Sequence, residues 1–172
     1  AVSVEELRLS DWGKVSKAAD QLEASQEEAI DPLLQMMQQA EKVKLTRTAD
    51  LIYPGADEFF GHGSVVDYDL DYLPARAGWV LERITFQDLG FENARHAAPE
   101  LNQESRAQAA EKARVWWGEQ KGWRRSDALL EALRSKNSHR QLMALGYLRF
   151  GKSPCTGLDE PFYLKKLLPE VT

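Results

Sequence analysis

Acidic and aromatic side chains gather in one stretch of the chain, the acidic segment (residues 50–71). It reads DLIYPGADEFFGHGSVVDYDLD and holds six carboxylates, two tyrosines and one histidine, with no lysine or arginine. Side chains of these types can bind a cation, catalyse proton transfer together with the histidine, or recognise a partner protein. A connection of about twenty residues is unusual in a compact domain and tends to be functional. The acidic segment is therefore the first candidate for a functional site.

Three alternating aspartates, Asp67, Asp69 and Asp71, could direct their oxygens onto a calcium ion. An EF-hand loop that begins at Asp67 also needs glycine at its sixth position and glutamate at its twelfth. Tyr72 and Gly78 occupy those positions, so the spacing excludes an EF-hand. A looser calcium site remains open, and so does a simpler role in which one aspartate caps the following helix. We predict no cofactor and no bound metal.

His62 lies between two glycines, which free the backbone and could expose its imidazole ring. A carboxylate of Asp57, Glu58 or Asp67 could orient this ring as a general base. The chain has no serine elbow, phosphate-binding glycine loop or metalloprotease motif to accompany it. We predict a structural or partner-contacting role for His62 and no enzymatic activity, with a hydrolase as the alternative.

The single cysteine, Cys155, excludes an internal disulfide and a cysteine-rich zinc site. Its surroundings, Ser-Pro-Cys-Thr-Gly, indicate a loop rather than a helix start that would lower the pKa of the thiol. The three histidines, His62, His96 and His139, show no zinc-binding spacing. We interpret Cys155 as incidental to function.

Length and composition predict one helical domain that spans residues 1–172. The chain is 43% hydrophobic and 28% charged, and no apolar run approaches the length of a membrane-spanning helix. Its net charge of -5 argues against a general nucleic-acid-binding protein, which needs a basic surface. We therefore expect neither nucleic-acid binding nor membrane insertion.

Charge is unevenly distributed between the two ends of the sequence. Residues 1–31 contain eight acids and three bases, whereas residues 121–152 contain eight bases and two acids. The two charge excesses could balance each other within the molecule, or one of them could steer a charged partner. The sequence leaves both interpretations open, together with a homodimer.

Apolar residues recur at helical spacing along most of the chain, which predicts an all-α protein. Ser10 is the expected cap of the first helix, and Asp31-Pro32 offers a helix start inside the second. The expected apolar stripes include Trp12 and Leu22 in the first helix, Leu33 and Met36 in the second, Val80, Leu81 and Ile84 in the helix at 69–84, and Leu142, Leu145 and Leu148 in a helix that opens at Ser138. The expected helices cover approximately residues 10–22, 25–40, 69–84, 102–117, 126–133, 138–150 and 159–168, and residues 64–68 give a weak strand signal.

Short helices joined by short turns cannot each bury an apolar face alone. This pattern suggests antiparallel pairs stacked in an array, as in helical-repeat proteins, with residues 50–70 as one long ordered connection. The sequence shows no exact internal repeat, so an irregular bundle remains an alternative.

Two blocks of sequence resemble a known group of proteins. The first block comprises residues 49–56 (ADLIYPGA), 60–63 (FGHG) and 68–71 (YDLD); the second comprises residues 76–86 (RAGWVLERITF), 88–91 (DLGF) and 116–117 (WW). Over about residues 45–120 the chain is similar to small bacterial helical proteins with HEAT- or armadillo-like folds, most of unassigned function. The resemblance implies packing roles for Trp79 and Phe86 and a turn at Gly90.

The size and helical class of the chain, with a start at Ala1 that could follow a removed secretory signal, also make it similar to immunity proteins, which inhibit peptidoglycan amidases delivered by type VI secretion. This second resemblance implies a periplasmic protein whose Ala1 follows a removed signal peptide. A boundary chosen for expression, with a cytoplasmic location, is the alternative.

These observations predict a protein-binding inhibitor. Its most concrete form is an immunity protein that covers the active site of a secreted cell-wall amidase or hydrolase, its cognate effector. Aromatic rings would fix the acidic segment while exposed carboxylates contact the effector. The expected partner contacts are Tyr53, His62, Asp67, Tyr68, Asp69 and Asp71. A helical scaffold whose functional surface is a groove elsewhere is a further alternative.

Overall fold

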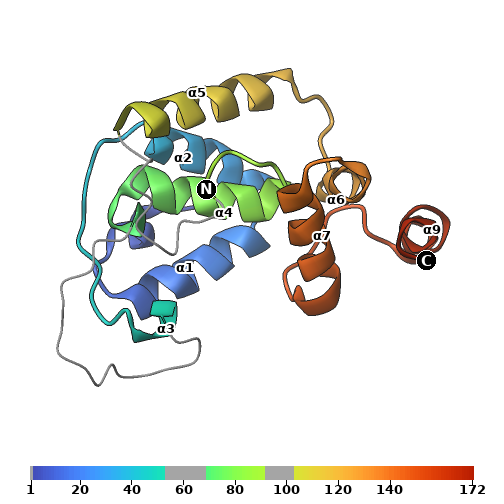
Figure 1. The fold of residues 1–172 in the computed structure, drawn as a ribbon, viewed down its shortest axis with the longest axis horizontal. Coiled ribbons are helices and arrows are strands. Elements are labelled where there is room, and N and C mark those ends of the chain that lie inside the picture. The colour runs from blue at the N-terminus through green and yellow to red at the C-terminus, as the bar shows by residue number, and fades with distance from the viewer. Residues whose placement is uncertain (1, 53–68, 92–102) are drawn as a thin grey trace.

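The computed structural model confirms the predicted all-α class (Figure 1). It describes residues 2–52, 69–91 and 103–172. The α-helices are α1 (Trp12–Ala24), α2 (Glu27–Met37), α3 (Ala49–Ile52), α4 (Leu73–Thr85), α5 (Gln103–Glu119), α6 (Arg125–Arg134), α7 (Ser138–Phe150), α8 (Glu160–Phe162) and α9 (Leu168–Val171). Two 3-10 turns, η1 (Glu5–Arg8) and η2 (Asp69–Asp71), precede α1 and α4, and a π-helical turn, η3 (Tyr163–Leu167), joins α8 to α9. In these ranges no strand forms, and no helix combines the length and hydrophobicity needed to cross a bilayer.

The central helix is α4, which packs against α1, α2, α5 and α6 (Figure 1). Pro74 lies in its first turn, where a missing backbone N–H costs least. The helix ends at Phe86, which adopts a left-handed conformation with φ of 55°. In a regular helical array each pair of helices contacts only its neighbouring pairs. One central helix that contacts four others does not establish such an array, so the HEAT-like stacking stays a prediction.

Close packing around α4 depends on Gly78. A Cβ atom at this position would lie 2.3 Å from Cε2 of Phe91, whose ring is fully buried. The glycine thus lets the chain that follows α4 fold back against the helix. Val80, Leu81 and Ile84 are also completely buried, as the predicted apolar stripe requires.

The starts of α1 and α2 differ from the sequence prediction in detail. Asp11, rather than Ser10, caps α1, because its carboxylate accepts a hydrogen bond of 3.1 Å from the backbone N–H of Lys14. Helix α2 begins directly after Gln26, and Pro32 lies inside it instead of marking a new start. Both helices still present the predicted apolar faces to α4.

The buried apolar residues form two clusters. The N-terminal cluster combines side chains from η1, α1, α2, α4 and α5. The C-terminal cluster consists of Phe86, Ala128, Leu129, Leu130, Ala132, Ala144, Phe162 and Leu167. Phe86, at the end of α4, therefore ties the C-terminal helices to the central one.

Candidate functional site

Most of the predicted partner contacts lie outside the described residues. Tyr53, His62, Asp67 and Tyr68 belong to residues 53–68, together with the predicted strand at 64–68. Asp69 is described only as a backbone position in η2. The contact roles of these five residues and the catalytic alternative for His62 therefore stay predictions.

Asp71 is the exception, and its predicted role as a partner contact is wrong. Its side chain is completely buried. The carboxylate accepts hydrogen bonds from the backbone N–H of Leu45 (2.8 Å) and from Nζ of Lys44 (2.9 Å). Its own carbonyl accepts a bond from the N–H of Val43 (2.7 Å). Asp71 thus fixes residues 43–45 beside the start of α4 and cannot reach a partner.

Arg76, in the first turn of α4, binds three other chain segments in the same buried region. Its guanidinium donates to the carbonyls of Leu7 (2.5 Å), Leu9 (2.7 Å), Val43 (2.5 Å) and Leu70 (2.5 Å). Burial lowers the pKa of Arg76 to about 10, although nearby Asp71 opposes the shift. The guanidinium therefore stays charged at neutral pH, and its role is structural.

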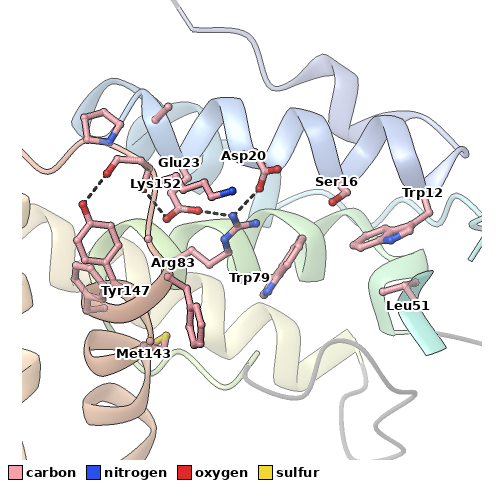
Figure 2. A pocket seen from close by; sticks show the side chains of 17 residues that line it. Trp12, Ser16, Asp20, Glu23, Leu51, Trp79, Arg83, Met143, Tyr147 and Lys152 are labelled. Atoms are coloured by element: carbon pink, nitrogen blue, oxygen red, sulfur yellow. Dashed lines mark hydrogen bonds and ion pairs between the residues drawn. The ribbon is translucent and has the colours of Figure 1, made fainter. Parts of the chain in front are cut away.

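An open groove of about 810 Å³ lies where α1, α4 and α7 meet (Figure 2). Its apolar lining includes Trp12, Trp79, Phe86, Met143, Tyr147 and Phe150. The rings of Trp12 and Trp79 are 5.8 Å apart and tilted by 34°. The volume falls in the range of ligand pockets, and aromatic walls with a few fixed polar groups are typical of binding sites. This groove is the candidate functional site.

An ion-pair network holds the polar side of the groove in place (Figure 2). Glu23 of α1 accepts hydrogen bonds of 2.9 Å from Arg125 Nη2 and from Ser153 Oγ. Arg83 of α4 pairs with Glu23 and, at 2.8 Å, with Asp20. The network therefore connects α1 and α4 to the start of α6 and to the loop after α7.

Arg125 is the buried centre of this junction. Its guanidinium also donates to the carbonyls of Arg83 (2.8 Å), Ile84 (3.0 Å) and Pro154 (2.8 Å). The rings of Phe86 and Tyr147 lie on it, with centroids 5.1 Å and 4.7 Å from Cζ. One side chain thus organises the end of α4, the loop after α7 and the polar side of the groove.

Two of the three leucines predicted to form the apolar stripe of α7 lie contrary to the prediction, whereas Leu148 packs against the C-terminal cluster. Leu142 is 67% exposed and Leu145 is 48% exposed, whereas Ala144 is buried. Phe150, at the end of the helix and on the groove wall, is 71% exposed. The prediction fails because apolar residues occur on several sides of α7, and the small Ala144 gives the close contact with the C-terminal cluster.

A second polar group joins α4 to α7 through a buried glutamate. Glu82 Oε1 accepts hydrogen bonds from the backbone N–H groups of Leu89 (3.1 Å) and Phe91 (2.7 Å). Its Oε2 lies 3.1 Å from Nε2 of His139. Burial raises the pKa of Glu82, although the bonds to His139 and the backbone oppose the shift. The pair therefore couples the end of α4 to the start of α7.

Glu82, His139 and Asp88 each offer a ligand atom within 4.8 Å of the others, so a metal ion could be held there. The carboxylates already accept hydrogen bonds: Asp88 accepts from Asn137 Nδ2 at 2.9 Å and from the N–H of Gly90 at 3.2 Å. Desolvation acts against ionisation of Asp88, but these bonds and nearby positive charge outweigh it and lower its pKa. We interpret the group as a structural junction.

Two further features do not extend the candidate site. Burial raises the pKa of Cys155 to about 11, so its thiol stays protonated at neutral pH, in line with an incidental role. A smaller hollow of about 290 Å³ lies between the end of α2 and the start of α5. There the Arg106 guanidinium covers the ring of Tyr72 at 3.8 Å.

Comparison with known proteins adds no relative to this description. No protein-family model matches the chain, and neither the curated proteins nor the solved structures contain a match. The resemblances drawn from sequence therefore stay predictions, and the groove has to be interpreted from its own chemistry.

Sequence reasoning named several groove residues without recognising the groove. It placed Trp12 on an apolar helix face and assigned packing roles to Trp79 and Phe86, and all three line the site. It missed Glu23 and Arg125, which are 102 positions apart in the chain and meet only after folding. The alternative of a scaffold whose functional surface is a groove stays a prediction as well.

Proposed function

We propose that this protein is a protein-binding inhibitor, most concretely an immunity protein that covers the active site of a secreted cell-wall amidase. The observation that carries the proposal is the aromatic-lined groove with the exposed apolar side chains of α7 beside it. The sequence resemblances point to the same class of function.

The lining of the groove suits recognition of a protein. Protein-binding hot spots are enriched in tryptophan, tyrosine and arginine, and they lie in pockets surrounded by less critical contacts. Trp79 and Tyr147 are partly buried on opposite walls, and Arg83 lies over the Trp79 ring at 4.9 Å. Ring contacts hold Trp79, a hydrogen bond holds Tyr147, and ion pairs hold Arg83. Binding of a partner would therefore cost little conformational entropy for ordering these side chains.

Exposed apolar side chains next to the groove extend the proposed interface. Single exposed leucines are ordinary, but contiguous apolar patches mark interaction sites. Leu142, Leu145 and Phe150 lie on one helix that also forms a groove wall. A partner that fills the groove would therefore cover these side chains as well. Under this proposal the acidic segment remains an additional contact.

The test is reconstitution with a purified candidate effector. Secreted peptidoglycan amidases encoded beside this protein are mixed with it, and complex formation and peptidoglycan hydrolysis are measured. We expect a stable complex and loss of hydrolysis at stoichiometric inhibitor. If no such amidase is bound or inhibited, and gentle co-purification from the native host recovers no partner, the proposal is wrong.

A pair of variants places the interface. Phe150→Ala removes an exposed ring on the groove wall, and we expect binding to weaken by about tenfold or more, as for a hot-spot residue. Tyr163→Ala is the matched control, because Tyr163 is an exposed aromatic residue in η3 that does not line the groove. Equal effects of the two substitutions would place the interface elsewhere.

A further inference from the structure

The geometry points to a definite chemistry for the partner segment: an amphipathic stretch whose apolar side chains are flanked by carboxylates. Its docking surface is the α7 face, defined as Leu142, Leu145, Gly146, Arg149 and Phe150. This inference rests on the proposed function and specifies which part of a partner the groove and the α7 face would receive.

The α7 face is continuous with the groove. Leu142, Leu145 and Arg149 follow one another at helical spacings of three and four residues, which places them on one side of α7. Gly146 and Phe150 lie beside them and also line the groove. The apolar surface thus runs from the outside of α7 over its edge into the groove. An elongated segment with apolar side chains on one side would fit this shape.

The charges beside the groove favour a partner segment that is acidic over one that is basic. Helix α7 has the sequence SHRQLMALGYLRF and contains no carboxylate. The carboxylate of Glu131 lies 3.4 Å from Arg140. Within the described ranges Arg149 and Lys152 form no ion pair, and Arg149 lies over the Phe150 ring at 5.0 Å. The side chains of Arg149 and Lys152, near the exposed Phe150 ring, can therefore pair with an anionic group of a partner.

The acidic residues on the other side of the groove do not cancel this preference. Glu23 is paired with Arg83 and Arg125, and Asp20 is paired with Arg83. Their charges are neutralised within the protein, whereas no described residue forms an ion pair with Arg149 or Lys152. The groove edge nearest α7 is therefore positive, in line with the excess of bases in residues 121–152.

The same observations disfavour two other occupants. A second copy packed through its own α7 face would bring Arg149 and Lys152 toward their equivalents, and like charges across an interface cost several kcal/mol. A membrane surface is flat, so it would span the mouth of the groove without filling it. Its lipid tails would also leave the ion pairs of Glu23 and Arg83 facing an apolar phase.

The experiment uses the full chain and two fluorescein-labelled helical peptides. Both carry leucine and phenylalanine at the same positions on one face, and one has glutamate and the other lysine at the flanking positions. Fluorescence anisotropy should show the glutamate peptide binding about tenfold more tightly or better, because opposite charges attract and like charges repel at the rim. Its affinity should fall as salt increases.

Variants then locate the binding. Leu142→Ser and the double variant Arg149→Glu/Lys152→Glu should each weaken binding of the glutamate peptide about fivefold or more, and the double variant should reverse the charge preference. Leu164→Ser and Lys165→Glu are matched controls, because both residues are exposed in η3, away from the groove. We expect wild-type affinity from both controls.

Four outcomes would overturn the inference. They are equal binding of the two peptides, equal effects of the control substitutions, competition by phosphatidylglycerol vesicles but not by unlabelled glutamate peptide, and a dimer in sedimentation that Leu142→Ser abolishes. The proposed function is judged separately. If an amidase complex is weakened by Phe150→Ala and unaffected by Arg149→Glu/Lys152→Glu, the inhibitor proposal stands. The inference that the partner contributes an acidic segment is then wrong.

Discussion

The two apolar clusters of this protein differ in how completely they bury the helices that form them. Around α4, helices on several sides cover the central helix, and nearly all of its side chains are buried. Helix α7 buries Ala144 alone and leaves Leu142 and Leu145 in solvent. The central helix α4 is thus covered on almost all sides, whereas α7 keeps two leucines outside the core. Such exposure is what a binding surface requires.

A buried arginine organises each region, and the partners of the two arginines differ. Arg76 donates only to backbone carbonyls in the hydrogen bonds that the structure describes. Arg125 donates to carbonyls and also to the side chains of Glu23 and Ser153, which border the groove. The first arginine closes a core, and the second connects a core to the candidate site.

Removing the Arg76 guanidinium should have the largest effect on stability. Arg76→Met leaves four carbonyls without their donor, and each unmatched buried group costs roughly 1–3 kcal/mol, so we expect a loss of about 4 kcal/mol or more. Urea unfolding followed by circular dichroism measures the change. Arg47→Met, at an exposed arginine, is the control. Similar small effects of both would remove Arg76 from the central role given to it.

Arg125→Met should act more locally. It removes the guanidinium that joins Glu23 to the carbonyls of Arg83, Ile84 and Pro154, and loss of one partner from a buried pair costs about 3 kcal/mol or somewhat more. Hydrogen exchange should accelerate in α6 and α7 while α2 and α4 keep their protection. Uniform acceleration along the whole chain would contradict a division into two differently built regions.

Gly78→Ala tests how tightly the first region is packed. The added methyl group would overlap the Phe91 ring, and overpacking of this kind costs about 2 kcal/mol. Gly118→Ala is the matched control in α5, because a Cβ atom there would meet no described neighbour within 4 Å beyond its own helix. Alanine also favours a helix over glycine by about 0.5 kcal/mol or more. The two substitutions should therefore shift the unfolding midpoint in opposite directions.

Glu82 and Asp88 should show smaller, pH-dependent effects of opposite sign. The raised pKa of Glu82 means that its contribution to stability is lost as pH rises from 4.5 through its folded pKa. The free energy of unfolding of the Glu82→Gln variant should therefore increase relative to that of the wild type as pH rises. The lowered pKa of Asp88 gives stability that is present above pH 3.8 and lost as pH falls below it. The free energy of unfolding of the Asp88→Asn variant should therefore decrease relative to that of the wild type as pH rises. Urea unfolding between pH 3 and 7 measures both slopes, and equal signs would contradict the assignment.

The helical class and most helix positions could be predicted because they depend on local information. The stripe through Val80, Leu81 and Ile84 has the period of a helix, and Gly151 follows the end of α7 as expected. The start of α1 was misassigned by one residue because Ser10 and Asp11 are both good capping residues. Only the orientation of a side chain toward the N–H of Lys14 decides between them.

The candidate site was less predictable because it depends on distant contacts. Asp71 belongs to an acidic run and looks exposed in sequence, but the N–H of Leu45 and the ammonium of Lys44 draw it inside. Leu142 and Leu145 look like core residues because their spacing says that they share a face, without saying whether that face meets a neighbour. Tertiary packing determines both the burial of Asp71 and the exposure of the two leucines.

One measurement tests the central claim that the α7 face is a binding surface rather than part of the core. Leu142→Ser is examined by calorimetric titration with the inhibited amidase, after urea unfolding has measured its stability. We predict a stability within about 0.5 kcal/mol of wild type, as for a surface position, together with binding weakened about fivefold or more. Unchanged affinity, or a loss of stability typical of a core leucine, would contradict the account.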